Sequence, residues 1–129
     1  MGYRSEVKYV VSFKDPEQRE QFEQLVKHKG DEQLAQALDE LDVCGRYLVA
    51  RFDGVKWYPS YEDVQAHHKL MSYAREVFED DAAWRFVRIG EEDNDIEVDS
   101  DDPNDDLWEI LYPVRSIELN LSMPTTKGE

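Results

Sequence analysis

Cysteine is nearly absent from this sequence of 129 residues, in which Cys44 is the only one. An internal disulfide is therefore impossible, and the paired cysteines of a typical zinc site are lacking. Hydrophobic runs long enough to span a membrane are also missing, as is a basic n-region followed by an apolar h-region. These absences predict a soluble, cytoplasmic protein without a membrane anchor.

Basic residues are scarce as well. The chain has 15 Lys and Arg against 30 Asp and Glu, which gives a formal net charge of −15 at pH 7. Residues 90–109 carry 11 of the acidic residues and no Lys or Arg, so the rest of the chain is nearly balanced. The ten candidate partner-binding residues are all the acidic residues of this segment except Glu109: Glu91, Glu92, Asp93, Asp95, Glu97, Asp99, Asp101, Asp102, Asp105 and Asp106.

This local excess of carboxylates limits the kinds of molecule that the segment could bind. It repels the phosphates of nucleic acids and of anionic membranes, and it attracts basic protein surfaces. Duplex DNA shows about one negative charge per 1.7 Å of its axis, a density that an ordered acidic strand and loop can approach. The segment therefore predicts a surface that imitates nucleic acid and binds a basic protein, without binding nucleic acid or a membrane itself.

Hydrophobic periodicity predicts the secondary structure. Period-2 alternation indicates strands, and apolar residues three and four apart indicate amphipathic helices. The expected helices are 16–29, 31–41 and 60–79, and the expected strands are 7–13, 46–52, 55–58, 83–89, a short return strand near 96–98, and 107–119 with an interruption at Pro113. The pattern predicts an α+β fold, with a mostly antiparallel sheet and about three helices packed on one face. We expect a single domain over residues 1–121 and a disordered tail over 122–129.

The dipeptide Asp-Gly at 53–54, between two strand-like runs, is typical of a two-residue β-hairpin turn. Such a turn would place Phe52 opposite Val55 in the core. It would also place Arg51 opposite Lys56, an unfavourable pair of like charges. We therefore expect both basic side chains on the solvent side, near carboxylates.

The acidic segment itself is expected to be partly ordered. Ile96 and Val98 place apolar side chains inside it at the period of a strand, which a purely solvated tail would lack. Aromatic strand-forming residues also flank it on both sides. Residues 91–99 are therefore predicted to be structured, and residues 100–106 to form a mobile loop.

No complete catalytic motif is present. A calcium loop needs Gly at its sixth position and Glu at its twelfth, and the registers that start at Asp93 and at Asp99 both fail. His67 and His68 lie on the third expected helix without an HExxH motif or other convergent ligands, so they are interpreted as edging its apolar stripe. We predict no enzymatic activity, no cofactor and no metal site.

Three stretches of the chain, MGYRSEV, KWYPS and FVRIGEEDNDIEV, together resemble a group of small proteins encoded by tailed bacteriophages. The resemblance implies a phage origin, and small acidic phage proteins often act by binding host proteins. We therefore expect a phage accessory protein that works in the cytoplasm of the infected cell. It would bind and inhibit a host protein, such as a nucleic-acid-binding or defence protein, through its nucleic-acid-mimicking acidic surface.

Two alternatives stay open beside this expectation. The chain would also suit a phage structural or assembly-related domain whose acidic face serves only solubility. A metal-binding protein ranks third. The identity of the target, the oligomeric state and the strand order of the sheet are not predicted from the sequence.

Overall fold

The computed structural model describes residues 4–92, 95–103, 107, 109–113 and 117–119. The predicted tail at 122–129 lies outside these residues. In chain order the elements are β1 (Ser5–Ser12), α1 (Pro16–Lys29), α2 (Glu32–Asp39), β2 (Asp42–Cys44), β3 (Tyr47–Val55), α3 (Glu62–Phe78), the 3₁₀ helix η1 (Glu79–Asp81), β4 (Ala83–Ile89), β5 (Ile96–Asp101), β6 (Leu111–Pro113) and β7 (Ile117–Leu119).

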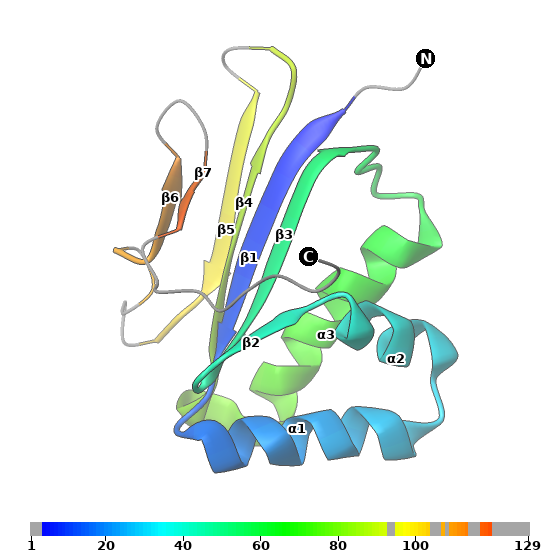
Figure 1. Cartoon of the computed structure of the whole chain (residues 1–129), viewed down its shortest axis with the longest axis vertical. Helices are drawn as coiled ribbons and strands as arrows, with labels where there is room; N and C mark the ends of the chain where they lie inside the picture. Colours follow the sequence, from blue (N-terminus) through cyan, green and yellow to red (C-terminus); the bar gives the residue numbers. More distant parts are fainter. Residues whose placement is uncertain (1–3, 93–94, 104–106, 108, 114–116, 120–129) are drawn as a thin grey trace.

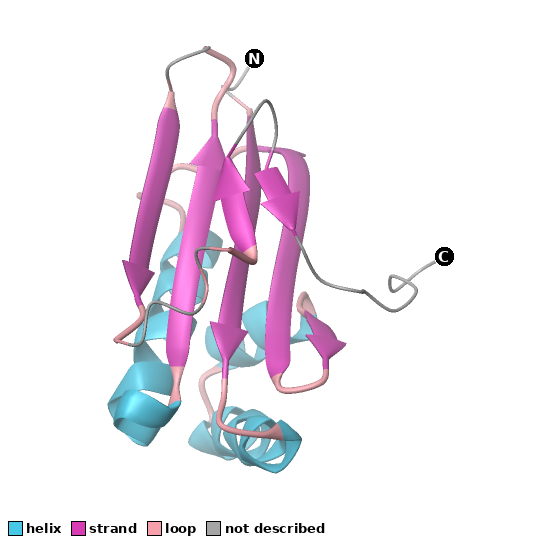
Figure 2. Ribbon diagram, turned by 90° about the vertical axis from the view of Figure 1, so that its left-hand side faces the viewer, coloured by secondary structure: helices cyan, strands magenta, loops and turns pink. Residues whose placement is uncertain are grey.

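Five of the strands form one antiparallel sheet in the order β2-β3-β1-β4-β5, so the first strand of the chain lies at its centre (Figure 1). β6 and β7 pair with each other in a separate antiparallel ribbon. The helices lie on one side of the sheet and the β6–β7 ribbon on the other (Figure 2). The predicted α+β fold with an antiparallel sheet is confirmed.

The starts of α1 and α2 follow from their capping residues. The side chain of Asp15 accepts a hydrogen bond of 2.8 Å from the backbone N–H of Gln18, and Pro16 occupies the first turn. Gly30, with φ of 80°, ends α1 in the left-handed conformation. The side chain of Asp31 caps α2 in the same way as Asp15 caps α1. The helix expected at 16–29 is confirmed with these bounds, and the helix expected at 31–41 is confirmed as the shorter range 32–39.

α3 begins at residue 62, two residues later than expected. Its N-cap is Tyr61, which makes no side-chain capping bond, although the preceding Ser60 is of the residue type that favours this position. The carboxylate of Asp63 instead accepts a hydrogen bond of 2.9 Å from the backbone of Val64. Packing of its apolar face onto the sheet therefore stabilises this helix more than its cap does. Within the described part of the chain, no helix is both long and apolar enough to cross a membrane.

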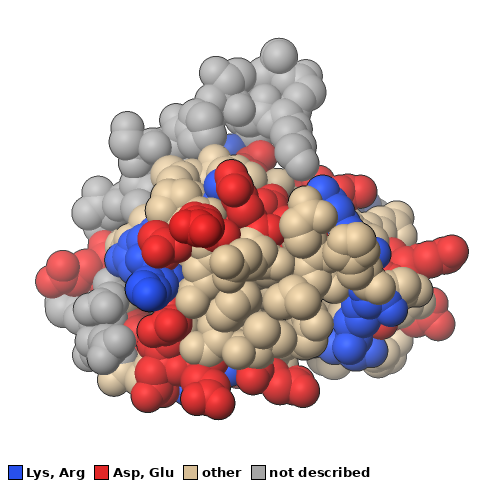
Figure 3. All heavy atoms as spheres, turned by 90° about the horizontal axis from the view of Figure 1, so that it is seen from below, with Lys and Arg blue, Asp and Glu red and all other residues tan. Residues whose placement is uncertain are grey.

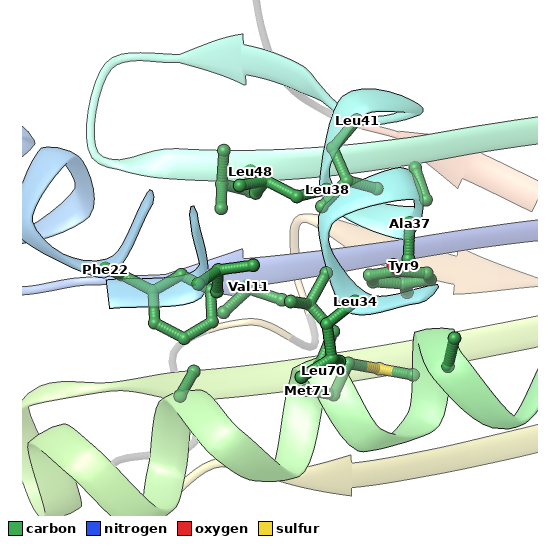
Figure 4. Close-up of a cluster of buried hydrophobic side chains, with 14 of the residues drawn as sticks. Tyr9, Val11, Phe22, Leu34, Ala37, Leu38, Leu41, Leu48, Leu70 and Met71 are labelled. Atoms are coloured by element: carbon green, nitrogen blue, oxygen red, sulfur yellow. The ribbon is translucent and has the colours of Figure 1, made fainter. Parts of the chain in front are cut away.

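The larger core fills the space between the helices and the sheet (Figure 4). Tyr9 and Val11 enter it from β1, and all three helices contribute side chains. A second cluster lies on the opposite face of the sheet, where Leu107 and Leu111 cover Val10 and Val87 and are themselves fully buried. Burial on both faces explains why β1 is apolar at nearly every position in its second half.

The predicted hairpin at residues 53–54 is wrong, because β3 runs through this dipeptide without turning. In the pairing with β1, Ser5 lies opposite Val55 and Val7 opposite Phe52. Residues 53–54 thus form the two-residue side of a β-bulge, with Gly54 at φ of 64°. The preference of Asp-Gly for positive φ is real, but the chain uses it to bend a strand.

The actual two-residue turn lies at Gly45 and Arg46, where Cys44 pairs with Tyr47. Gly45 has φ of 60°, and positive φ at the first turn position is typical of a type II′ hairpin. Because β2 has only three residues, the alternation that would indicate a strand before this turn is too short to be recognised in the sequence. Asp-Gly therefore carried the stronger hairpin signal although it lies inside a strand.

The predicted facing of Arg51 and Lys56 does not occur, because their hairpin is not formed. Arg51 is half-buried and binds Asp42 of β2, with 2.7 Å between Nη2 and Oδ2. Lys56 is exposed beyond the end of β3. The assignment of Phe52 to the core side still holds, since side chains alternate along β3 up to this residue whether or not the chain then turns.

Substitution of Gly54 tests the bulge. Gly54→Ala is expected to lower the free energy of unfolding by about 1 kcal/mol, because a side chain is strained at positive φ. An added Cβ atom would have no neighbour within 4 Å, so crowding makes no contribution. Gly54→Asn should cost clearly less, since Asn tolerates this conformation better. Urea denaturation of both variants measures the difference, and equal losses would contradict the bulge geometry.

Candidate functional site

The acidic segment folds back on β4 as its neighbour in the sheet. Gly90 donates a backbone hydrogen bond of 2.8 Å to Asp95, and Asp95 donates one of 3.0 Å to Glu92. From there β5 pairs with β4 along its whole length, with Arg88 opposite Glu97 and Phe86 opposite Asp99. The predicted return strand is confirmed, and it continues to Asp101. The predicted mobile loop at 100–106 is therefore wrong at its first two residues, whereas 104–106 lie outside the described residues.

Alternation along β5 separates its charged and apolar side chains. Asp99 is paired with Phe86, which belongs to the core beneath the helices, so the acidic positions share the helix side of the sheet. Val98 is paired with Val87 of the second core and lies on the other side. The helix side of β5 therefore carries a row of three carboxylates: Glu97, Asp99 and Asp101.

Arg88 organises the start of this row. Its Nη2 lies 2.8 Å from Oδ1 of Asp95, and its Nε lies 3.0 Å from Oε1 of Glu97. A third contact, 3.2 Å long, reaches the hydroxyl of Ser5 on β1. The hydrogen bonds to Asp95 raise the pKa of Arg88, so its charge is permanent. Arg88 thus holds two of the predicted site residues in place and neutralises part of their charge.

Arg75 of α3 binds the other end of the row. Its Nε lies 3.1 Å from Oδ1 of Asp101, and its Nη1 lies 3.6 Å from Oδ1 of Asp80. This ion pair crosses from the helix layer to the edge strand. Asp99, between the two arginine-bound ends, is exposed and makes no ion pair with any described residue. It is therefore the member of the row most open to a partner.

The remaining predicted site residues have separate environments. The carboxylate of Glu91 accepts a hydrogen bond of 2.9 Å from the backbone of Arg4. The carboxylate of Asp102 accepts one of 2.8 Å from the backbone of Leu107 and so holds the next segment of the chain. Glu92 is exposed. The predicted site residues outside the described part of the chain are Asp93, Asp105 and Asp106.

A pocket of about 270 Å³ adjoins the Arg88 network. Its lining includes Trp57, Tyr58 and His68 together with the carboxylates of Asp95 and Glu97. Burial lowers the pKa of His68, against the opposing effect of Glu97 and Asp99, so its imidazole is neutral at pH 7. A cationic side chain that entered here would meet aromatic rings and carboxylates together.

The sequence did not indicate that Arg75 and Arg88 belong to this site. Both arginines lie outside residues 90–109, where the carboxylates are concentrated. A usable signal for Arg88 did exist. It lies two residues before Gly90, so a tight return of the chain after Gly90 brings the following carboxylates back beside it. Arg75 had no such signal, because α3 and β5 meet only in the folded protein.

His67, the other histidine of the pair, is buried in the helix-side core. Its Nε2 lies 3.3 Å from a carboxylate oxygen of Glu40 and its Nδ1 lies 2.5 Å from the hydroxyl oxygen of Tyr9. A carboxylate can only accept, so Nε2–H donates to Glu40 and Nδ1 accepts from the Tyr9 hydroxyl. Burial is the main cause that lowers the pKa of His67, and the neighbouring His68 lowers it further. The carboxylates of Glu40 and Asp63 oppose this shift. No group of three or more potential ligands in the described residues is arranged to hold a metal ion.

Stability should fall at mildly acidic pH because of His67. The unfolded chain takes up this proton near pH 6.5, whereas the buried imidazole takes it up only at lower pH. The contribution of the neutral His67 imidazole to the free energy of unfolding is therefore complete above pH 6.5. This contribution is lost as the pH falls from 6.5 through the lowered pKa of the folded state. Urea denaturation between pH 7 and pH 5 should show a weaker pH dependence for His67→Gln than for the parent. The exposed-site variant His28→Gln should behave like the parent. An unchanged dependence in His67→Gln would contradict the assignment.

Comparison of the chain with protein-family models, with curated proteins and with solved structures finds no match in any of the three.

Proposed function

We propose that this protein is a phage accessory protein that binds a basic surface of a host protein and blocks it. The observation that carries the proposal is the row of Glu97, Asp99 and Asp101 on an exposed edge strand, with further carboxylates at both ends. The strand pairing holds these charges in a fixed arrangement, so a partner does not have to order them. Preorganised charge favours fast and selective association with a surface of opposite sign.

The local charge remains negative after the internal ion pairs are counted. Seven described carboxylates lie in residues 91–102, and the guanidinium groups of Arg75 and Arg88 bind three of them. An excess of five negative charges is left in this region. Acidic side chains also lie along much of the rim of the face seen from below (Figure 3), and they add to the long-range attraction.

A nucleic-acid-binding protein is the class of target that this charge fits best. Alternate side chains on one face of a strand are about 6.6 Å apart, so the β5 row alone is sparser than duplex DNA with one charge per about 1.7 Å. The row with its flanking carboxylates, Glu91, Glu92 and Asp95, would replace a short length of nucleic acid in a basic groove. The resemblance to phage proteins supports a host nucleic-acid-binding or defence protein as the target.

One observation favours a second function. Arg88 and Arg75 bind three of the acidic side chains, which shows that part of the segment stabilises the edge of the sheet. A phage structural or assembly-related domain would need no more than this, and its other carboxylates would serve solubility. This alternative predicts no host partner whose binding depends on salt.

Capture from a bacterial lysate separates the two functions. The immobilised protein should retain a specific host protein at low salt and lose it near 1 M salt, where the Debye length is only about 3 Å. Single-stranded DNA added at low salt should displace the same protein, because both compete for one basic surface. A partner that resists both treatments would contradict the proposal, and the absence of any partner would support the assembly-related domain.

A further inference from the structure

The outer edge of β5 carries backbone groups that no described strand pairs with. β5 is the last strand of the sheet order, and its pairing with β4 uses one edge only. In an antiparallel ladder the residues alternate between those bonded to the neighbouring strand and those whose backbone groups point away from it. The Gly90–Asp95 backbone bond of 2.8 Å sets this alternation. Because Asp95 is bonded to the β4 side, every second residue after it, Glu97, Asp99 and Asp101, also faces β4. The backbone groups of the residues in between, Ile96, Val98 and Ser100, therefore point to the open edge.

The hydrogen bond of Ser100 supports this assignment independently. Its backbone N–H donates to the side chain of its own neighbour Asp99, at 2.9 Å, instead of to β4. A backbone donor within the ladder would bond to β4. No described residue accepts a hydrogen bond from the outward N–H groups of Ile96 and Val98, so within the described part of the chain these donors are open to an added strand.

The two faces of β5 specify what kind of strand would fit. The helix face offers Glu97, Asp99 and Asp101, which call for basic side chains opposite them. On the other face Ile96 is 43% exposed and Val98 is 44% exposed, although both are apolar. An added strand with apolar residues on that face would cover them.

We propose that β5 accepts a sixth strand from the partner protein, an extended segment in which basic and apolar residues alternate. The inference rests on the proposed function and specifies how the acidic edge is used. Backbone hydrogen bonds to the outward groups of Ile96 and Val98 supply affinity, as in other cases of strand addition. The alternating side chains supply selectivity, because a shift by one residue would place basic groups on the apolar face.

Charge disfavours a second copy of this chain as the occupant. Two β5 strands paired side by side would bring two rows of carboxylates against each other, and like charges on facing strands are unfavourable. Acidic side chains on an edge strand are a recognised protection against such self-pairing. The same row that opposes a copy of itself attracts a basic strand.

Two heptapeptides with blocked ends provide the test. One alternates Lys and Val in the order Lys-Val-Lys-Val-Lys-Val-Lys, and the other has the same composition with four Lys followed by three Val. The unmodified protein is expected to bind the alternating peptide about tenfold more tightly, since one or two added backbone hydrogen bonds are worth about that factor. Hydrogen exchange at the amides of Ile96 and Val98 should slow only with the alternating peptide. Equal affinities without this protection would overturn strand addition.

Substitution at Val98 gives a matched pair of variants. Val98→Pro removes one outward donor and leaves the ladder to β4 intact, since Pro is tolerated on the open side of an edge strand. Val98→Thr keeps the donor. We expect the preference for the alternating peptide to fall severalfold in Val98→Pro, which keeps the outward groups of Ile96, and to persist in full in Val98→Thr. An undiminished preference in folded Val98→Pro would overturn strand addition.

The outcomes also separate this inference from the proposed function. If both peptides bind the unmodified protein equally and lose affinity at high salt, the proposed acidic binding surface is supported and strand addition is contradicted. Absence of binding by either peptide at low salt would contradict both. The exchange measurement needs only the unmodified protein, so it decides the question even if Val98→Pro does not fold.

Discussion

Replacing Phe22 by alanine is expected to lower the free energy of unfolding by about 3–5 kcal/mol, a large share of the roughly 5–15 kcal/mol that stabilises a typical domain. Phe22 is fully buried, and it joins α1 to the rest of the core. Its ring centroid lies 5.1 Å from that of Phe13 and 5.7 Å from that of Tyr73. Alanine would leave a cavity between α1, β1 and α3 that the rigid aromatic neighbours cannot fill.

Two control variants make this result specific. Phe22→Leu retains most of the volume and should cost only about 1 kcal/mol. Leu25→Ala, on the same helix but 39% exposed, should change stability by less than about 0.5 kcal/mol. Urea denaturation followed by circular dichroism measures all three. A loss in Phe22→Ala no larger than that in Leu25→Ala would show that α1 does not pack as described.

The second large effect concerns affinity. The triple variant Glu97→Gln, Asp99→Asn, Asp101→Asn is expected to bind the captured partner about a hundredfold more weakly. Each exposed charge pair contributes at most about 1 kcal/mol, so three contacts together reach about that factor. Its salt dependence should flatten as well, because fewer charges meet the partner. Titration calorimetry at two salt concentrations measures both changes.

The choice of residues in this variant follows from Arg88. On charge repulsion alone, the set Glu91, Glu92, Asp93, Asp95 and Glu97 would be neutralised with no cost to folding. The structure contradicts that expectation for Asp95 and Glu97, because both bind Arg88. The carboxylate of Asp95 makes two of these contacts, at 2.8 and 3.2 Å, and that of Glu97 makes one, at 3.0 Å. Asp95 therefore stays unchanged, and the amide oxygens of the new Gln and Asn side chains can still accept hydrogen bonds from the arginines.

A matched control removes the same number of charges elsewhere. Glu17, Glu32 and Asp53 are exposed and lie outside β5, so their conversion to Gln, Gln and Asn removes three charges without changing the acidic strand. This variant should lose less than about threefold in affinity, through weaker long-range attraction. If both triple variants bind equally, or the β5 variant is folded and binds like the parent, the acidic strand serves solubility and the proposed function is wrong.

Local patterns determined most of the secondary structure. α1 was predicted with its observed bounds, because Asp15, Pro16 and Gly30 are start and stop signals that act within a single turn. β4 was also predicted with its observed bounds from its alternation and its flanking residues. The bulge at Gly54 was misread as a turn, because positive φ serves both structures equally well. Only the partner strand, β1, decides between them.

The sequence by itself also determined that Glu97 and Asp99 lie on one face of a strand and Ile96 and Val98 on the other, since side chains alternate in any strand. Only the tertiary structure decided which face meets the helices, that β5 is an edge, and that Arg75 and Arg88 bind its carboxylates. The physical reason is that these features depend on strand order and on helix placement. Both arise from contacts between residues far apart in the chain, which local periodicity does not encode.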